Sequence, residues 1–347
     1  MQFEGAWTAL ITPFLEDRGI DWAGFKKNLE FQMSQGISGV LPMGTTGESP
    51  SVNWQEHNDL VVEAVKMTEG KCGLLAGSGS NSTDEAMTST LHAYDHGARA
   101  VLLVDCYYNG PSSQELRDEY YAPVAAAKSD VAIVPYIIPG RTGTALTPED
   151  LAILYSKYPN VCAVKEATGD LERMAKTREL CGDNFSIMSG DDDITYSMMT
   201  DERIKASGVI SVMSNVVPGA VERMVRLILA GNIEEATNLR DALSPIFAIV
   251  TVKVKNERRL PNGQTVMVED RYRNPLAVKT LMNGLGMPAG PTRRPLGMMT
   301  KTGVDVVRSA ARQIWENNPE LFEPIGDFYG VDIGERITSD AYWPCVS

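Results

Sequence analysis

The chain has 347 residues, 43% hydrophobic and 22% charged, with a formal net charge of −13. This composition excludes disordered and fibrous proteins. The acidic balance argues against a nucleic-acid partner, because there is no surplus of lysine and arginine to displace counterions from phosphates.

The first seven residues lack the basic and apolar regions of a secretion signal, and no apolar run is long enough to span a bilayer. The five cysteines are widely spaced and lie mostly in apolar runs, as buried thiols do in a reducing compartment. We therefore expect a cytoplasmic protein with no membrane partner. His92 and His96 are four residues apart but have no further ligands, which favours helix-surface histidines over a metal site.

From residue 6 to about residue 230, short β-like runs alternate with amphipathic helical segments. The expected strands are residues 7–12, 39–42, 73–76, 100–104, 132–136, 162–165, 186–189 and 208–212. Helices are expected between them, for example at residues 22–34, 55–67, 83–96, 114–127, 148–157 and 217–230. Eight βα units favour a closed (β/α)8 TIM barrel over an open doubly wound sheet, so residues 1–230 are predicted to form the catalytic barrel domain.

Residues 231–317 are predicted to form a C-terminal helical annex. Two alternating runs near residues 251–270 interrupt it and indicate a β-hairpin with a turn at Gly263. Residues 318–347 contain several prolines and glycines, which predicts a tail that packs along the surface.

In a closed barrel, functional residues gather where strands end and loops begin, at the carboxyl face. Unusual sequences follow five of the predicted strands, at residues 44–49, 107–109, 136–143, 165 and 190–193. We expect them to share one mouth.

Lys165 ends an apolar run and begins a polar one, so it lies where a buried strand becomes a loop. Partial desolvation would lower the pKa of its ammonium and free the amine to attack a carbonyl carbon, as in a Schiff-base enzyme. A solvated charge at the end of a strand remains the alternative.

The loop at residues 44–47 presents backbone amides and the hydroxyls of Thr45 and Thr46, with no positive side chain. This suits a small carboxylate better than a polyphosphate, although an ordinary glycine-rich turn fits the same residues. Tyr136 ends a strand and could transfer protons, or it could only fill the barrel. Arg141 could bind a carboxylate in a bidentate fork, or it could be a solvated loop residue.

The acidic run at residues 191–193 cannot converge on one metal ion from the start of a helix. We therefore interpret it as capping the N-terminus of the helix that follows, rather than as a Mg²⁺ site.

In this order and at these spacings, the loop sequences resemble the dihydrodipicolinate synthase and N-acetylneuraminate lyase family of pyruvate-dependent class I aldolases. The resemblance covers most of residues 1–317 and depends on residues 44–48, on Tyr136 with residues 139–141, and on residues 165–169. The Gly-Arg pair that ends at Arg141 is similar to the dihydrodipicolinate synthase branch, whose arginine holds the carboxylate of aspartate semialdehyde.

The resemblance implies a lyase that condenses pyruvate with L-aspartate 4-semialdehyde to give 4-hydroxy-tetrahydrodipicolinate, in lysine and diaminopimelate biosynthesis. Lys165 would form an iminium with C2 of pyruvate and then an enamine that attacks the aldehyde. No metal or organic cofactor is required, because the iminium is itself the electron sink.

The resemblance also assigns roles to the other loop residues. Tyr136 would shuttle protons through Thr46 and through Tyr108, which a neighbouring subunit would donate in a homotetramer built as a dimer of dimers. Thr45 and Thr46 would hold the carboxylate of pyruvate, and the pocket would be lined by Gly190 and Ile210.

Relatives that lysine inhibits bind it at a dimer interface near the active site. The matching positions here are Ser49, Pro50, Trp54, His57, Asn81, Glu85 and Tyr107. Glu85 could pair with an ammonium and Trp54 could pack on an aliphatic stem, so we hypothesise feedback inhibition by L-lysine. That these residues only build a dimer interface is the alternative.

Two residues beside the predicted pocket, Ile137 and Asp105, depart from the family pattern and leave the acceptor aldehyde open. One alternative is another pyruvate-type Schiff-base aldolase or dehydratase acting on a sugar acid or an aromatic substrate, against which Arg141 argues. The other is a non-catalytic barrel that binds an oxo acid or an amino acid, against which the pair of Lys165 and Tyr136 argues.

Overall fold

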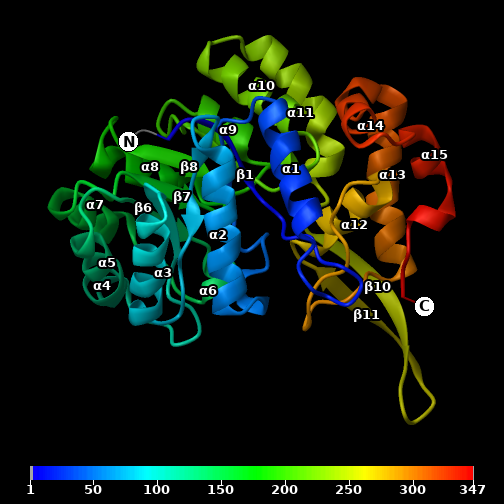
Figure 1. Ribbon diagram of the computed structural model, residues 1–347, viewed down its shortest axis with the longest axis horizontal. Helices are drawn as coiled ribbons and strands as arrows, with labels where there is room; N and C mark the ends of the chain where they lie inside the picture. Colours follow the sequence, from blue (N-terminus) through cyan, green and yellow to red (C-terminus); the bar gives the residue numbers. More distant parts are fainter. Residues whose placement is uncertain (1–2, 347) are drawn as a thin grey trace.

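A closed parallel barrel forms one side of the protein, with the C-terminal helices beside it, in the computed structural model, which describes residues 3–346 (Figure 1). Met1 and Gln2 of the predicted barrel domain and Ser347 of the predicted tail lie outside the described residues.

The barrel strands run in the order β3-β2-β1-β9-β8-β7-β6-β5-β4, and every neighbouring pair is parallel. They are β1 (Gly5–Ala9), β2 (Gly39–Leu41), β3 (Gly73–Leu74), β4 (Ala76–Gly77), β5 (Ala100–Val104), β6 (Ala132–Ile137), β7 (Ala163–Glu166), β8 (Ser186–Ser189) and β9 (Gly208–Ser211). The two ends of this order, β3 and β4, are consecutive in the chain and separated only by Leu75, whose amide donates to the carbonyl oxygen of Val40 at 3.0 Å. They are therefore two pieces of one strand, and the predicted eight-stranded barrel is confirmed.

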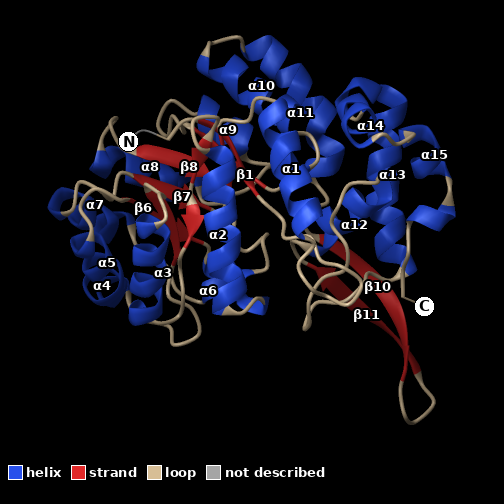
Figure 2. Cartoon of the chain, in the orientation of Figure 1, coloured by secondary structure: helices blue, strands red, loops and turns tan. Residues whose placement is uncertain are grey.

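Helices follow the strands and cover the outside of the barrel (Figure 2). They are α1 (Trp22–Ser34), α2 (Trp54–Thr68), α3 (Thr83–Asp95), α4 (Ser113–Glu115) with the π-helix η2 (Leu116–Tyr121) and α5 (Ala122–Ala127), α6 (Pro139–Thr142), α7 (Pro148–Lys157), α8 (Leu171–Cys181), α9 (Thr195–Thr200) and α10 (Pro218–Leu229). Local sequence defines their starts: Asn53 and Glu56 form a reciprocal capping box at α2, and Thr147 accepts a hydrogen bond from the Asp150 amide at α7. A short 3-10 turn, η3 (Met213–Asn215), connects β9 to α10.

Successive side chains along each strand point to opposite sides of the barrel wall, and this divides the core into two layers. In β6, Val134 and Tyr136 belong to a cluster inside the barrel, whereas Ile133 and Ile137 belong to the larger cluster between the barrel and its helices. At the carboxyl ends of the strands, side chains therefore face the mouth and the helical layer in turn, so that neighbouring residues point in opposite directions.

The C-terminal part consists of helices and a hairpin. The elements are α11 (Ile233–Phe247), β10 (Val252–Arg259), β11 (Thr265–Tyr272), α12 (Leu276–Leu285) and α13 (Lys301–Asn317). The antiparallel pair β10–β11 runs from Val252 opposite Tyr272 to Arg259 opposite Thr265, and its distal end projects beyond the helices (Figures 1 and 2). Gly263, with φ of 86°, allows the turn.

The tail forms η4 (Pro319–Leu321), α14 (Glu323–Tyr329), α15 (Ile333–Thr338) and η5 (Asp340–Tyr342). Trp343 is buried against α12, where a Cβ on Gly284 would lie 2.4 Å from the indole ring. The tail thus packs onto the annex, and the division at residues 230 and 317 stays a prediction.

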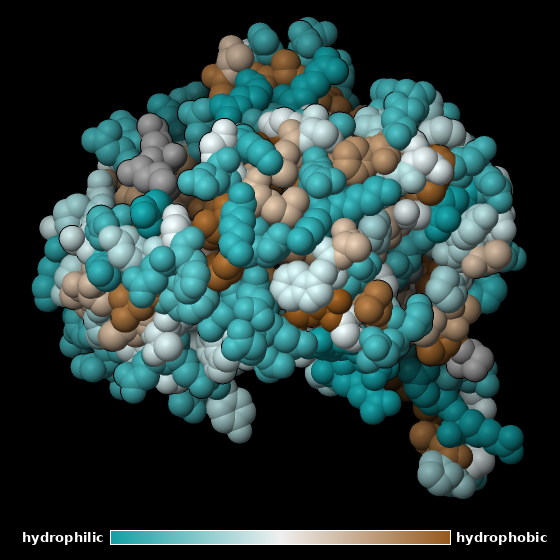
Figure 3. All heavy atoms as spheres, viewed as in Figure 1, coloured by the Kyte–Doolittle hydropathy of each residue, from teal (hydrophilic) through white to brown (hydrophobic). Residues whose placement is uncertain are grey.

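Hydrophilic residues cover most of the face in Figure 3, with apolar side chains in scattered patches. The hairpin exposes the apolar side chains of Leu260, Met267 and Val268. Among the described residues, no helix has the length and apolar character needed to cross a membrane.

Candidate active site

Lys165 lies in β7 at the carboxyl end of the barrel, and only 4% of its surface is exposed. Burial lowers the pKa of its ammonium to about 8, although the nearby carboxylates of Asp191 and Asp192 oppose this shift. Within residues 3–346, no hydrogen bond or ion pair engages its Nζ atom. The side chain is therefore a buried amine that is available for reaction.

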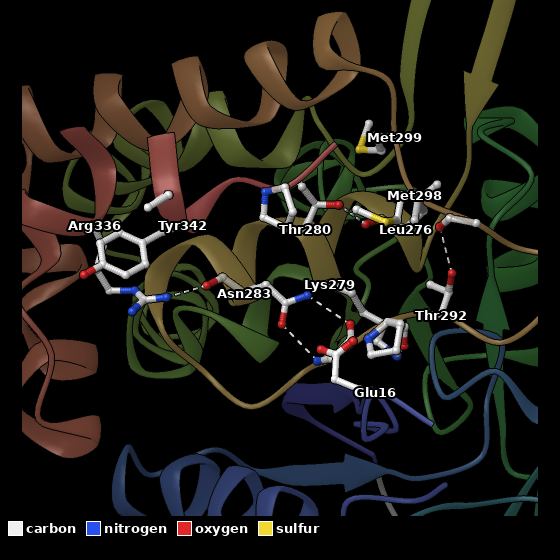
Figure 4. A pocket seen from close by; sticks show the side chains of 15 residues that line it. Glu16, Leu276, Lys279, Thr280, Asn283, Thr292, Met298, Met299, Arg336 and Tyr342 are labelled. Atoms are coloured by element: carbon white, nitrogen blue, oxygen red, sulfur yellow. Dashed lines mark hydrogen bonds between the residues drawn. The ribbon is translucent and has the colours of Figure 1, made fainter. Parts of the chain in front are cut away.

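A second buried lysine shows what a structural role looks like. Burial also lowers the pKa of Lys279 to about 8, but its Nζ atom lies 2.8 Å from a Glu48 carboxylate oxygen and donates to the carbonyl oxygens of Thr12 and Pro291 at 3.0 and 2.7 Å. It borders a cavity of about 410 Å³ between α12 and the C-terminal segment (Figure 4). Because its ammonium is fully paired, the lowered pKa does not indicate a nucleophile there.

Tyr136 faces Lys165 from the neighbouring strand. The two residues are register partners in β6 and β7, and Nζ of Lys165 lies 4.3 Å from the centre of the phenol ring. Burial raises the pKa of Tyr136, while Arg141 and a hydrogen bond from Thr45 oppose the rise. The phenol is therefore protonated at neutral pH and next to the amine, where it can give and take a proton.

The loop after β2 is tightly wound and tied to the annex. The Gly47 amide donates to the Gly44 carbonyl oxygen at 3.1 Å, and the Thr12 hydroxyl donates to the Gly47 carbonyl oxygen at 2.7 Å. Thr46 is buried, and its hydroxyl oxygen accepts a hydrogen bond of 2.9 Å from the side-chain amide of Asn274. Asn274 therefore holds this hydroxyl in place at the mouth.

A cavity of about 260 Å³ joins these groups. Among its lining residues are Lys165, Tyr136, Thr46, Arg141 and Gly190. Four of the five loop sequences predicted to share one mouth thus meet at this site; residues 107–109 do not line it, and Tyr107 borders a separate cavity instead. Thr45 borders an adjoining cavity of about 460 Å³ that shares Arg141.

Position 190 has no room for a side chain, so only glycine fits there. A Cβ at this position would lie 2.7 Å from Cβ of Ala167, 3.1 Å from the Glu166 carbonyl oxygen and 3.2 Å from Cε of Lys165. Any side chain would therefore push against the reactive lysine.

Besides Thr45, two predicted residues do not line this cavity. Ile210 is fully buried in the cluster inside the barrel, below the mouth. Tyr108 is 90% exposed and has φ of 78°, an uncommon conformation for a bulky residue. It lies outside the cavity of its own chain.

The acidic run after β8 caps a different element from the one predicted. Asp192 is buried and accepts hydrogen bonds from the Ser211 hydroxyl and from the amides of Val212 and Met213, at 3.0 and 3.2 Å for the amides. The helix that follows, α9, starts without a side-chain cap. The prediction of N-terminal capping was therefore wrong, because the carboxylate turns back toward the end of β9. Burial raises the pKa of Asp191 to about 6.

Ile137 and Asp105, the two residues that differ from the family pattern, do not face the cavity. Ile137 points into the layer between barrel and helices. Asp105 is fully buried, where it accepts a hydrogen bond of 2.5 Å from the Tyr121 hydroxyl and one of 3.2 Å from the Leu146 amide, and burial raises its pKa to about 7. They do not define the acceptor pocket directly.

The annex also lines the cavity, with five residues that were not predicted from the sequence: Val250, Thr251, Arg271 at the end of β11, Arg273 and Asn274. Arg271 and Arg273 are two apart next to an extended strand, a spacing that places side chains on one face. That spacing was visible in the sequence, but the place where the hairpin docks was not.

The predicted effector residues gather around a separate, smaller cavity of about 160 Å³. Its lining includes Ser49, Pro50, Trp54, His57, Asn81, Glu85 and Tyr107. The Glu85 carboxylate accepts a hydrogen bond of 2.5 Å from the Ser80 hydroxyl, and the Trp54 and His57 rings lie 5.1 Å apart, centre to centre. A carboxylate and an aromatic surface are thus available to a cationic ligand with an apolar stem.

In the part of the chain that the structure describes, no group of three or more histidine, cysteine, aspartate or glutamate side chains is arranged to hold a metal ion.

Comparison with known families matches residues 2–314 to the model of the dihydrodipicolinate synthetase family. A curated 4-hydroxy-tetrahydrodipicolinate synthase from Methanothrix thermoacetophila is 40% identical over 299 residues, which cover 86% of this chain and 92% of that protein.

Solved structures agree with the sequence comparison. The 4-hydroxy-tetrahydrodipicolinate synthase of Methylacidiphilum fumariolicum SolV superimposes with a TM-score of 0.82 at 32% identity, covering 93% of this chain and 99% of that one. The dihydrodipicolinate synthase of Cyanidioschyzon merolae, solved with lysine bound, has a TM-score of 0.80 at 31% identity, covering 90% and 98%.

Proposed function

The chain belongs to the dihydrodipicolinate synthetase family, and from the geometry around Lys165 we propose how it carries out the reaction of that family. It is a Schiff-base-forming lyase that condenses pyruvate with L-aspartate 4-semialdehyde to give 4-hydroxy-tetrahydrodipicolinate, in lysine and diaminopimelate biosynthesis. The observation that carries the assignment of roles is the unpaired, buried amine of Lys165 beside the Tyr136 phenol in one cavity.

The neutral amine of Lys165 adds to C2 of pyruvate, and loss of water gives an iminium. The iminium withdraws electrons from the neighbouring methyl group, which loses a proton to become an enamine. The enamine carbon then attacks the aldehyde carbon of the semialdehyde, whose oxygen takes up a proton. Attack of the acceptor's amino group on C2 closes the ring and releases Lys165.

Tyr136 exchanges the protons of these steps, because its hydroxyl is the protonated group next to the amine. Thr46 takes part in the relay, and its position is held by Asn274. The third member, Tyr108, acts in the cavity of a neighbouring subunit. Its 90% exposure and its left-handed backbone support this role, because both are costly for a tyrosine that has no partner.

The two substrates are held by their carboxylates. The amides and hydroxyls of Thr45 and Thr46 bind the carboxylate of pyruvate. A tight turn that presents such donors can bind a carboxylate without a positive side chain. Arg141 binds the carboxylate of the semialdehyde from the rim of the cavity. Gly190 leaves the space that the iminium needs beside Lys165.

L-lysine inhibits from the smaller cavity, and the chain assembles as a dimer of dimers. The support is the set of residues that line this cavity, which includes Glu85 for an ammonium and Trp54 for an aliphatic stem, together with the lysine-bound structure of the Cyanidioschyzon merolae relative.

Borohydride trapping in the presence of pyruvate tests the catalytic assignment. The peptide that contains Lys165 should gain the mass of a reduced pyruvate adduct, and a matched sample without pyruvate should not. Absence of the adduct would eliminate the Schiff-base function. A coupled assay with aspartate semialdehyde then distinguishes this reaction from that of an aldolase acting on a sugar acid.

A further inference from the structure

The base of the hairpin contributes two positive charges to the mouth of the active site. Arg271, at the end of β11, and Arg273 line the cavity that contains Lys165, together with Arg141 from the loop after β6. The same three arginines line the adjoining cavity of about 460 Å³. The hairpin thus forms a wall of the substrate entrance, although it is remote from the barrel strands in sequence.

No carboxylate neutralises these three guanidinium groups. Within residues 3–346, none of them lies within ion-pair distance of an acidic side chain; Arg141 donates to the Asn274 carbonyl oxygen and Arg273 to the Gly140 carbonyl oxygen, both at 2.9 Å. By contrast, Arg293 in the adjoining cavity is held by Glu56 at 2.6 Å. Convergence of like charges in a chain of net charge −13 indicates a site that an anion completes.

The three arginines also influence one another. The surrounding protein lowers the pKa of Arg141, and the neighbouring Arg273 and Arg271 lower it further. Independently, the side-chain oxygen of Asn274 is buried and has no hydrogen-bond partner among the described residues, although its amide nitrogen holds Thr46. An unpartnered buried acceptor beside unpaired arginines fits a ligand that carries both an acid group and a donor.

We propose that Arg271 and Arg273 are specificity-determining residues of the acceptor subsite, where they bind the carboxylate of the aldehyde substrate together with Arg141. This inference rests on the proposed function, because it assigns an additional part of the same site. Pyruvate lies deeper, against Thr45 and Thr46, so the hairpin discriminates between acceptors and leaves the first substrate unaffected.

Steady-state kinetics of the variants Arg271→Gln, Arg273→Gln and the double variant test the proposal. KM for aspartate semialdehyde should rise about tenfold for each lost guanidinium, and KM for pyruvate should stay within about twofold of the wild-type value. Arg→Lys variants should be intermediate, since they keep the charge and lose the fork. Added salt should raise the wild-type KM for the semialdehyde more than that of the double variant.

Arg259→Gln is the matched control, because this exposed arginine lies on the other strand of the same hairpin, outside the cavity; it should change neither KM. Trapping of pyruvate on Lys165 shows whether the active site of each variant is intact. If a Gln variant does not form the trapped adduct, the KM values of the corresponding Lys variant test the proposal instead.

The proposal is overturned if KM for the semialdehyde is unchanged in the double variant, or if both KM values rise together. Either result leaves the proposed function intact. Conversely, a wild-type protein that neither traps pyruvate nor turns over the semialdehyde contradicts the proposed function itself.

Discussion

Nζ of Lys165 lies 4.3 Å from the centre of the Tyr136 ring, and the two residues are partners across adjacent parallel strands. Strand pairing therefore sets the distance between amine and phenol, with no flexible loop between them. Sites built on strands hold their geometry more accurately than sites built on loops.

Removal of one oxygen atom tests the proton-transfer role of Tyr136. Tyr136→Phe keeps the ring against Lys165 but loses the hydroxyl, so kcat should fall about 100- to 10,000-fold. Stopped assays with both substrates would measure the loss. Tyr155→Phe is the control, because this ring packs against Phe185 outside the cavity. A kcat within a few-fold of wild type would contradict the role.

The pKa of Lys165 predicts the acid limb of the pH profile. Because the pKa is about 8 and only the free amine adds to pyruvate, kcat/KM for pyruvate should rise with pH and level off above about pH 8. Below that pH, kcat/KM for pyruvate should fall about tenfold for each pH unit. A midpoint near the ordinary value of lysine, about 10.4, would show that burial does not lower the pKa as inferred.

The carboxylate of Asp191 provides a second check on the same profile. Its charge raises the pKa of Lys165, so Asp191→Asn should move the acid limb to lower pH. A shift in the opposite direction would show that the two groups do not interact as described.

The space at Gly190 predicts a steric effect. Gly190→Ala places a methyl group 2.7 Å from Cβ of Ala167, so the backbone there must shift, and 3.2 Å from Cε of Lys165, so the lysine must give way by a few tenths of an ångström. We expect kcat/KM for pyruvate to fall about tenfold, because small displacements of a reacting group lower the rate. Gly140→Ala is the matched control, because it lines the same cavity with nothing within 4 Å of the added Cβ. Equal losses in both variants would contradict the steric argument.

Regulation by lysine is tested at Glu85. If its carboxylate binds the effector's ammonium, Glu85→Gln should raise the lysine concentration that gives half-inhibition about tenfold or more, with unchanged turnover in the absence of lysine. Asp84→Asn is the control, since this neighbouring acid in α3 does not line the effector cavity. Failure of millimolar lysine to inhibit the wild-type protein would remove the hypothesis.

The barrel and the positions of Lys165 and Tyr136 could be predicted because they depend on local patterns. Alternating strands and helices define a barrel, and residues at the carboxyl ends of its strands must meet. The same rule of alternation places Ile137 on the opposite face from Tyr136, so its remoteness from the cavity was also implicit in the sequence.

The contribution of the hairpin could not be predicted in this way. Arg271 and Arg273 reach the cavity through tertiary packing of the annex on the barrel, which no local periodicity encodes. The partners of Asp192 were missed for a similar reason, because its carboxylate binds amides at the end of the next strand and not those of its own helix.

The ion pair between Lys279 of α12 and Glu48 of the loop after β2 has a consequence for protein engineering. A barrel cut after residue 230 would keep Lys165 and Tyr136 but would lose Lys279, the counter-ion of Glu48. It would also lose Asn274 and both hairpin arginines from the entrance. Catalysis in this chain therefore needs a longer segment than the barrel alone. Grafting the barrel without the annex onto another scaffold would transfer the nucleophile without its binding site.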